Sequence, residues 1–207
     1  MAQKRNQRGS TSLVKKAVSI AAHEDGTLRL AVVADTHSAP HPDITKHLVA
    51  LKPDAILHAG DIGDLDVLDG LAAVAPLFAV RGNIDVRAQD LPDVLTLDVI
   101  WRDGIMARIL LTHIAVNGPK LRVEIARLAV VEDASLVVCG HSHVPFIGRD
   151  RELTMFNPGS IGPRRFTLPI MFGTIEISPT DIRLTHIDCE TGKPWTPPAR
   201  GSGLNPG

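Results

Sequence analysis

The first part of the chain alternates short apolar runs with segments of helical periodicity, and this order restricts the fold more than any other feature. The apolar runs at residues 28–35, 55–61 and 77–83 predict strands. The segments between them, residues 43–51 and 65–74, predict helices. A β-α-β-α-β order indicates parallel strands joined by right-handed crossovers.

The second half of the chain is richer in predicted strands. A helix over residues 120–131 is indicated by Pro119 at its start and by an apolar stripe through Ile125. Hydrophobic residues make up 44% of the chain and aromatic residues only 3%, so the core must consist mainly of Val, Ile, Leu and Ala. We expect one α/β domain over residues 28–189. The predicted strands of this half are 93–101, 105–112, 135–139, 152–156, 170–177 and 181–187.

Both ends of the chain differ in composition from this domain. Residues 1–27 are polar and basic and predict a mobile N-terminal extension, with a transit peptide or a weak nucleic-acid-binding arm as alternatives. Residues 190–207 are rich in Pro and Gly and predict a C-terminal tail. Beyond residue 22 the chain carries 17 basic and 23 acidic residues, a balance that argues against extended nucleic-acid binding.

The chain has no apolar run close to the roughly 18 residues that a membrane span needs, so we expect no span. Cys139 and Cys189 are its only cysteines, and their positions do not resemble a disulfide framework. These features favour a reducing, cytoplasmic setting.

Residues that can bind a metal follow the predicted strands at the point where each strand ends. Because the carboxyl ends of parallel strands lie on one edge of a sheet, these side chains should converge there. The residues are Asp35 and His37, Asp61, Asn83 and Asp85, His113, and finally His141 and His143.

Taken singly, most of these segments have an ordinary structural explanation. The segments "DTH" (35–37) and "GNID" (82–85) are compatible with plain turns, and Asp61 with a helix N-cap. A single histidine such as His113 at a strand end is more often a core residue than a ligand. The segment "GHSH" (140–143) is the least ambiguous, because two histidines two residues apart on an extended chain point to the same side. The occurrence of all five segments in order favours a metal site.

The types of side chain indicate which ions the site would bind. Imidazole combined with carboxylate or amide oxygen suits Mn, Fe, Zn or Co, whereas an all-oxygen set would suit Mg or Ca. Seven ligands are too many for one ion. Sharing a carboxylate between two ions about 3.5–4 Å apart is the arrangement used by phosphatases and nucleases.

In the order and spacing of these segments the chain resembles the calcineurin-like metallophosphoesterases. The likeness is greatest to their small single-domain branch, which contains bacterial and archaeal phosphodiesterases and the related retromer subunit. The resemblance implies a four-layer α/β/β/α sandwich with a dimetal site at the carboxyl edges of its sheets. The matching motifs are "DTH" 35–37, "GD" 60–61, "GNID" 82–85, "TH" 112–113, "GHSH" 140–143 and "NPGS" 157–160.

The resemblance also implies how the ligands are divided. The first ion would be held by Asp35, His37, Asp61 and His143. Asp61 would also bind a second ion. The other ligands of that ion would be Asn83, His113 and His141. A hydroxide bridging the ions would attack a phosphodiester of a phosphorylated small molecule. We expect Mn first, with Fe, Zn, Co or Ni as alternatives.

Several residues depart from the pattern of the family. The third motif carries Ile84 where many members have a histidine, and the fourth carries Ile114 and Ala115 where this branch commonly has glycine and histidine. Poor proton delivery to the leaving group is the expected consequence. A metal-binding scaffold for protein–protein interaction, with little catalysis, is therefore the alternative function.

Further roles are expected for five residues. Asp61, Asn83 and Asp85 form the expected catalytic set, with Asp85 orienting a ligand. Arg164 is either a bidentate phosphate clamp or a surface arginine. Asn157 is expected to form a tight loop beneath the site.

Overall fold

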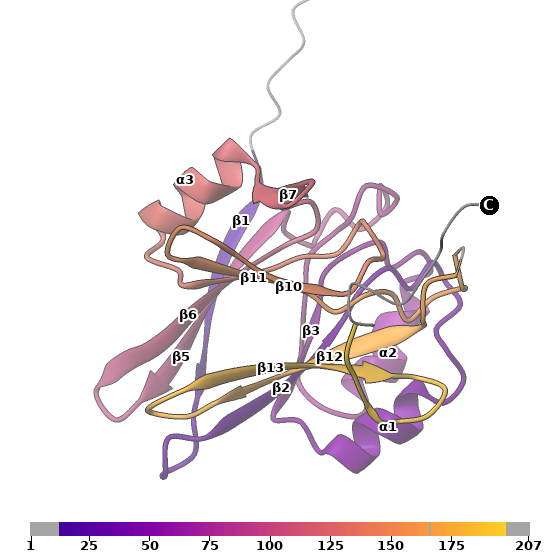
Figure 1. Cartoon of the computed structure of the whole chain (residues 1–207), viewed down its shortest axis with the longest axis horizontal. Helices are drawn as coiled ribbons and strands as arrows, with labels where there is room; N and C mark the ends of the chain where they lie inside the picture. Colours follow the sequence, from indigo (N-terminus) through magenta and orange to yellow (C-terminus); the bar gives the residue numbers. More distant parts are fainter. Residues whose placement is uncertain (1–12, 166, 198–207) are drawn as a thin grey trace, which may run out of the picture.

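The computed structural model describes residues 13–165 and 167–197. Two six-stranded sheets face each other, and helices cover their outer surfaces (Figure 1). The helices α1 (Ile44–Leu51) and α2 (Asp66–Ala72) pack on one sheet, and α3 (Val123–Val131) packs on the other. This is the predicted α/β/β/α sandwich. No helix in the described part of the chain is long and apolar enough to cross a membrane.

The two sheets draw their strands from both halves of the chain. The first sheet has the order β1 (Lys15–Ala21), β5 (Val94–Trp101), β6 (Gly104–Thr112), β9 (Leu136–Val138), β11 (Leu153–Asn157) and β10 (Phe146–Asp150). The second has the order β14 (Pro194–Trp195), β13 (Ile182–Asp188), β12 (Met171–Ile177), β2 (Leu28–Val33), β3 (Ala55–His58) and β4 (Leu77–Ala79). A small hairpin consists of β7 (Val116–Asn117) and β8 (Lys120–Leu121).

Strands β2, β3 and β4 pair in parallel, which confirms the predicted β-α-β-α-β unit. Their side chains alternate between two cores because successive residues of a strand face opposite sides. Along β2, Leu30 and Val32 enter the core between the sheets, whereas Ala31 and Val33 enter the core beneath α1 and α2. The carboxyl ends of these parallel strands therefore lie at one edge of the sheet. Both faces of this sheet are buried.

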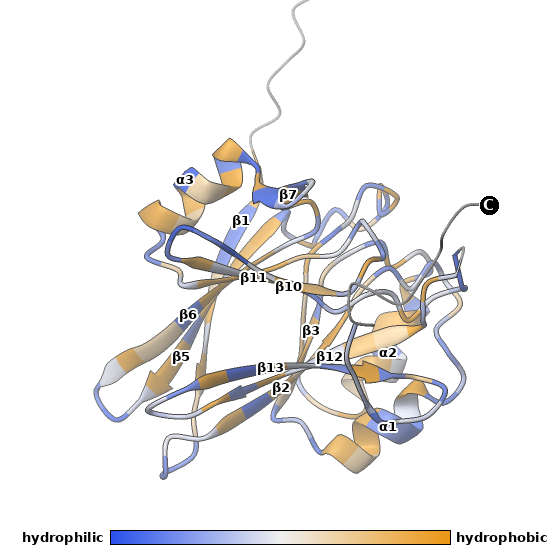
Figure 2. Ribbon diagram, in the orientation of Figure 1, coloured by the Kyte–Doolittle hydropathy of each residue, from blue (hydrophilic) through white to orange (hydrophobic). Residues whose placement is uncertain are grey.

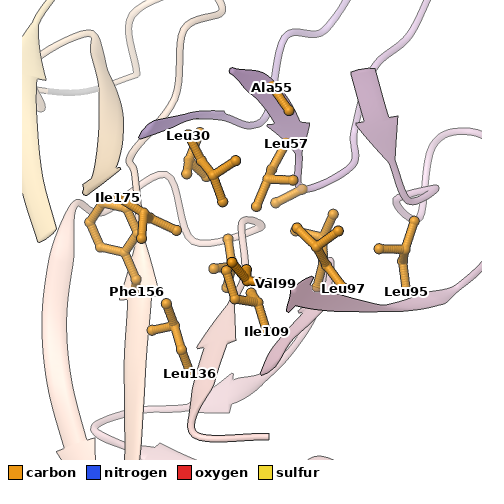
Figure 3. Packing of buried hydrophobic residues seen from close by; sticks show 14 of the residues in the cluster. Leu30, Ala55, Leu57, Leu95, Leu97, Val99, Ile109, Leu136, Phe156 and Ile175 are labelled. Atoms are coloured by element: carbon orange, nitrogen blue, oxygen red, sulfur yellow. The ribbon is translucent and has the colours of Figure 1, made fainter. Parts of the chain in front are cut away.

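The core between the sheets is aliphatic with one large aromatic ring (Figure 3). Phe156 of β11 is fully buried there and lies against residues of the opposite sheet such as Ile175. A side chain at Gly173 would collide with the ring of Phe156, so the glycine makes room for it. The predicted reliance on Val, Ile, Leu and Ala is confirmed.

The prediction of a mobile N-terminal extension over residues 1–27 is wrong for its described part. Residues 15–21 form β1, which pairs in parallel with β5 along the whole strand, and Val18 and Ile20 pack against the core between the sheets. The partner strand is more than seventy residues away, so the local composition gives little sign of the pairing. Residues 1–12 of that predicted extension lie outside the described residues.

The predicted C-terminal tail also begins too early. Strand β14 pairs antiparallel with β13, and the ring of Trp195 lies 6.0 Å from that of His186. Pro194 is tolerated because β14 is an edge strand, where a missing N–H breaks no ladder. Residues 198–207 of the predicted tail lie outside the described residues.

Shortening Ile20 tests whether β1 belongs to the folded domain. We expect Ile20→Ala to lower the free energy of unfolding by about 1 kcal/mol, because a half-buried aliphatic side chain loses part of its apolar contact. Ser19→Ala is the matched control, since Ser19 is exposed on the opposite face of the strand. Urea unfolding midpoints measure both. Equal midpoints for the two variants would mean that β1 adds no stability.

Candidate metal centre

The loops that leave the carboxyl ends of four strands, β2, β3, β6 and β9, converge on two groups of metal-competent side chains. Within each group, one ligand atom per residue lies within 4.8 Å of those of the others. Loops from both sheets contribute, so the site lies where the sandwich edges meet. The first group consists of Asp35, His37 and His143, and the second of Asp61, His113 and His141.

In the first group, ring nitrogens face one another and a carboxylate. His37 Nε2 lies 3.2 Å from His143 Nε2, and His143 Nε2 lies 3.5 Å from Asp35 Oδ1. Asp35 Oδ2 is buried and accepts no hydrogen bond from the described residues. Two imidazole nitrogens that face each other, beside a carboxylate oxygen without a hydrogen-bond donor, are a suitable set of ligands for a cation.

In the second group, a backbone contact sets the tautomer of a histidine. His113 Nδ1 lies 2.7 Å from the carbonyl oxygen of Ala59, to which it can only donate. Nε2 then lies 3.1 Å from both Asp61 Oδ1 and Asn83 Oδ1, and it is the ring nitrogen left to bind a metal when the ring is neutral. His141 Nδ1 also lies 3.1 Å from Asn83 Oδ1. A histidine oriented through its second nitrogen is the usual arrangement of a metal ligand.

Asp61 faces both groups. Its Oδ1 lies 3.1 Å from His113 Nε2 of the second group, and its Oδ2 lies 3.8 Å from His37 Nε2 of the first. The side chain is 5% exposed, so water solvates it little. One carboxylate is thus shared between the two groups, as a bridging ligand would be.

The acid groups and histidines of the site perturb one another's ionisation. Burial raises the pKa of Asp35 to about 7, with the neighbouring Asp61 charge adding to the rise. Burial also acts to raise the pKa of Asp61, but the hydrogen bond and charge of His113 outweigh it and lower that pKa to about 2. Burial, followed by the charge of Arg165, lowers the pKa of His143 to about 4. A neutral histidine is the form that binds a metal.

Most of the converging residues have left-handed backbone. A non-glycine residue with positive φ carries a conformational cost of about 1–3 kcal/mol and is concentrated at functional sites. Hydrogen bonds between the loops hold this backbone, as the Asp35 N–H donates to the Gly60 carbonyl and the His37 N–H to the Asp61 carbonyl. The residues with positive φ in the site are Asp35, His37, Asp61, His141 and His143.

Asp85 binds backbone and belongs to neither group. Its carboxylate accepts hydrogen bonds from the N–H groups of Ile62 at 2.9 Å, Gly63 at 3.0 Å and Gly82 at 2.7 Å. These residues flank Asp61 and Asn83 in the sequence. Asp85 therefore hydrogen-bonds to both loops that carry Asp61 and Asn83.

His58 and Asn157 are buried and form hydrogen bonds with the loops that carry the ligand residues. His58 Nδ1 accepts a hydrogen bond from the Gly60 N–H at 3.1 Å, and its Nε2 contacts the Thr36 hydroxyl. Asn157 donates to the Gly140 carbonyl at 2.7 Å and accepts from the Gly159 N–H at 2.9 Å, which forms the tight loop expected there. The contacts of His58 connect the "DTH" and "GD" motifs, and those of Asn157 connect the "GHSH" and "NPGS" motifs.

A glycine is required where two ligand loops cross. A Cβ atom at Gly82 would collide with both the Oδ1 and the backbone nitrogen of Asp61. We expect Gly82→Ala to displace Asp61 and to weaken Mn²⁺ binding about 10–100-fold. Gly104→Ala is the control, because no atom lies within 4 Å of its added Cβ. Calorimetric titration of Mn²⁺ measures both, and equal affinities would contradict the crowding at Asp61.

Two of the positions that depart from the family pattern, Ile84 and Ala115, differ in burial. Ala115 is 1% exposed and packs in the core beneath α3, where an imidazole would need space that the core fills. The side chain of Ile84 is 40% exposed, and its backbone N–H donates to Asp61 Oδ1 at 3.2 Å. The backbone of residue 84 thus holds the shared carboxylate although its side chain cannot transfer a proton.

The structure directs Arg164 away from the site. Its guanidinium lies 2.6 Å from Glu190 and donates to the Leu168 carbonyl at 3.0 Å. The neighbouring Arg165 lies at the site instead, with Nη2 3.2 Å from His37 Nε2. No spacing rule distinguishes two consecutive arginines in a loop, so the sequence could not select Arg165.

Comparison with known proteins gives relatives of one kind. Residues 28–180 match the sequence profile of the calcineurin-like phosphoesterase superfamily domain. A probable metallophosphoesterase of Methanocaldococcus jannaschii is 30% identical over 143 residues, which are 65% of this chain and 69% of the relative. The phosphodiesterase YfcE of Escherichia coli is 26% identical over 102 residues, which are 48% of this chain and 52% of that protein.

Solved structures share the fold of this chain. The crystal structure of Vps29 from Entamoeba histolytica complexed with Zn²⁺ superposes with a TM-score of 0.65 at 20% identity, covering 81% of this chain and 96% of Vps29. At this identity the likeness is one of fold. The extent of the profile match and the identity to the archaeal relative show that the chain belongs to the calcineurin-like phosphoesterase superfamily.

Proposed function

We propose that the chain is a phosphodiesterase that depends on two divalent metal ions. Asp35, His37 and His143 would hold the first ion, and Asn83, His113 and His141 the second. Asp61 would bridge them. The observation that carries this proposal is the position of Asp61, whose two oxygens face the two groups separately.

The chain's own residues determine which chemistry the site can support. Two ions held there would lower the pKa of a water molecule and neutralise phosphoryl oxygens. Asn83 offers a neutral oxygen, which adds a ligand without adding charge. Asp85 and the Ile84 N–H fix the loops around Asp61. Mn is the ion we propose first, with Fe, Zn, Co and Ni as alternatives.

Leaving-group chemistry provides a prediction. With no imidazole at residue 84 or 115, the described ligand loops present no evident acid to protonate a departing alkoxide. General acid catalysis typically contributes about 10²–10⁴-fold, so we expect aryl phosphodiesters to be hydrolysed faster than alkyl phosphodiesters by at least about 10²-fold. Initial rates with Mn²⁺ for matched aryl and alkyl methyl phosphates measure the ratio. Equal rates would sink this account of residues 84 and 115.

The same assay tests the choice of diesters over monoesters. The proposal expects faster turnover of a bis-aryl phosphate than of the aryl monophosphate, with Asp61→Asn as the blank. The name of the E. coli relative, a phosphodiesterase, supports the choice. A monoester preferred over its diester would contradict the proposed substrate class.

A metal-binding scaffold for protein–protein interaction is the second candidate. The observation that favours it is a set of exposed valines on α3, a helix that Figure 2 colours as largely hydrophobic. Val123, Val130 and Val131 are 62%, 71% and 77% exposed. Such residues are more common at contact surfaces than on isolated helices. Ions bound without turnover of any phosphoester would support this candidate against the enzyme.

A further inference from the structure

Arg165 is the cationic side chain in contact with the first ligand group. Its Nη2 lies 3.2 Å from Nε2 of His37. The residue is exposed, and no ion pair joins it to a carboxylate in the described part of the chain. An arginine without an acidic partner, placed against metal-competent nitrogens, calls for a specific explanation.

Buried contacts hold the segment that presents Arg165. The Ser160 hydroxyl donates to the Asp35 carbonyl at 2.9 Å, and the Gly162 N–H donates to the Ser160 hydroxyl at 3.1 Å. The Ile161 N–H donates to the Ala34 carbonyl at 3.2 Å. A Cβ at Gly162 would collide with the Asp35 carbonyl oxygen, so the two loops approach as closely as glycine permits. The base of the Arg165 segment is thus fixed to the loop that carries Asp35 and His37.

The charges decide what Arg165 can do there. A guanidinium next to a divalent cation is repelled by its charge. An anion that lies between the guanidinium and the metal ion is attracted to both, and these attractions offset the repulsion between the two cations. A phosphoryl group has oxygens for both, and the planar guanidinium fits phosphate oxygens through paired N–H donors.

We infer that Arg165 is a substrate-binding residue, which donates hydrogen bonds to the phosphoryl oxygens of a phosphoester or of the phosphate product. This inference rests on the proposed function and adds to it the residue that binds the anion. Arg165 acts on the side of the first group, since its contact is with His37. It contributes charge and orientation, and it transfers no proton because an arginine stays protonated.

The neighbouring arginine supplies a matched control. Arg164 and Arg165 lie in the same loop and carry the same charge, but Arg164 is paired with Glu190. Removing either guanidinium changes the net charge of the protein equally. A difference between the two variants therefore reports position and not overall electrostatics.

The experiment titrates inorganic phosphate into full-length protein loaded with Mn²⁺ and follows binding by calorimetry. We expect Arg165→Ala to weaken phosphate binding about 10–100-fold, the loss of a charged hydrogen-bonding partner. Arg164→Ala should stay within about threefold of wild type, and Arg165→Lys should recover part of the affinity, because lysine restores the charge without the paired donors. Mn²⁺ affinity without phosphate should not fall in Arg165→Ala, since the substitution removes only a repulsive charge.

The possible results distinguish failure of the role of Arg165 from failure of the proposed phosphodiesterase function, on which that role rests. Equal phosphate affinity in Arg165→Ala and Arg164→Ala, with phosphoester hydrolysis retained, overturns the role of Arg165 and leaves the phosphodiesterase proposal standing. Loss of Mn²⁺ binding in Arg165→Ala also overturns it, because the residue would then act through the ligands. Wild-type protein that binds Mn²⁺ but neither binds phosphate nor hydrolyses any phosphoester overturns both proposals.

Discussion

Asp61→Asn is expected to lower the rate of Mn²⁺-dependent phosphodiester hydrolysis about 10³-fold or more. The substitution keeps the shape of the side chain but removes the charge shared between the two groups, and one of its two oxygens becomes an amide nitrogen that cannot bind a cation. Electrostatic stabilisation by two ions contributes several kcal/mol, so losing the arrangement costs orders of magnitude in rate. Initial rates at saturating Mn²⁺ measure the effect.

A second carboxylate substitution shows that this loss is local. Asp64→Asn removes the same charge three residues away, from an exposed side chain, and should leave the rate within a factor of about two. Circular dichroism should show that both variants are folded. Hydrolysis by Asp61→Asn at the wild-type rate would exclude a shared carboxylate from the chemistry.

Asp85→Asn is expected to lower the free energy of unfolding by about 3 kcal/mol. The wild-type carboxylate accepts from the N–H groups of Ile62, Gly63 and Gly82, and an asparagine must turn an NH₂ group towards some of them. Each buried N–H left without an acceptor costs about 1–3 kcal/mol. Chemical unfolding of metal-free protein measures this loss without any contribution from ions.

The same variant should also bind Mn²⁺ more weakly, because the loops that carry Asp61 and Asn83 lose their common anchor. Asp64→Asn is again the control, since its side chain is exposed. A stability equal to that of the control would mean that the three N–H groups find other acceptors, and Asp85 would lose its positioning role.

The sequence predicted the parallel unit and the converging ligands because both depend on local signals. Apolar runs of strand length and the residues that follow them are close together in the chain, and the edge on which parallel strands end is fixed by topology. The order of strands then brings Asp35 and Asp61 to one edge without further information, whereas His113 follows β6 of the other sheet. The resemblance of the motifs to those of the metallophosphoesterases was needed to predict the second sheet and the division of the ligands between two ions.

Features that depend on distant partners could not be predicted in this way. Strand β1 begins with two lysines and is mostly exposed, and only its pairing with β5 shows that it belongs to a sheet. Strand β14 begins with Pro194, which disfavours a strand unless it lies at an edge. Arg164 and Arg165 have equal local signals, and the contacts with Glu190 and His37 distinguish them.

The number of Mn²⁺ ions bound per chain, counted by native mass spectrometry on the sample whose phosphodiester hydrolysis is assayed, tests the central claim most directly. The two-group geometry predicts two ions per wild-type chain, accompanied by turnover that Asp61→Asn lacks. A chain that binds one ion or none and yet hydrolyses the ester would contradict the dimetal site. A chain that binds two ions without turnover above that of Asp61→Asn would contradict the enzyme.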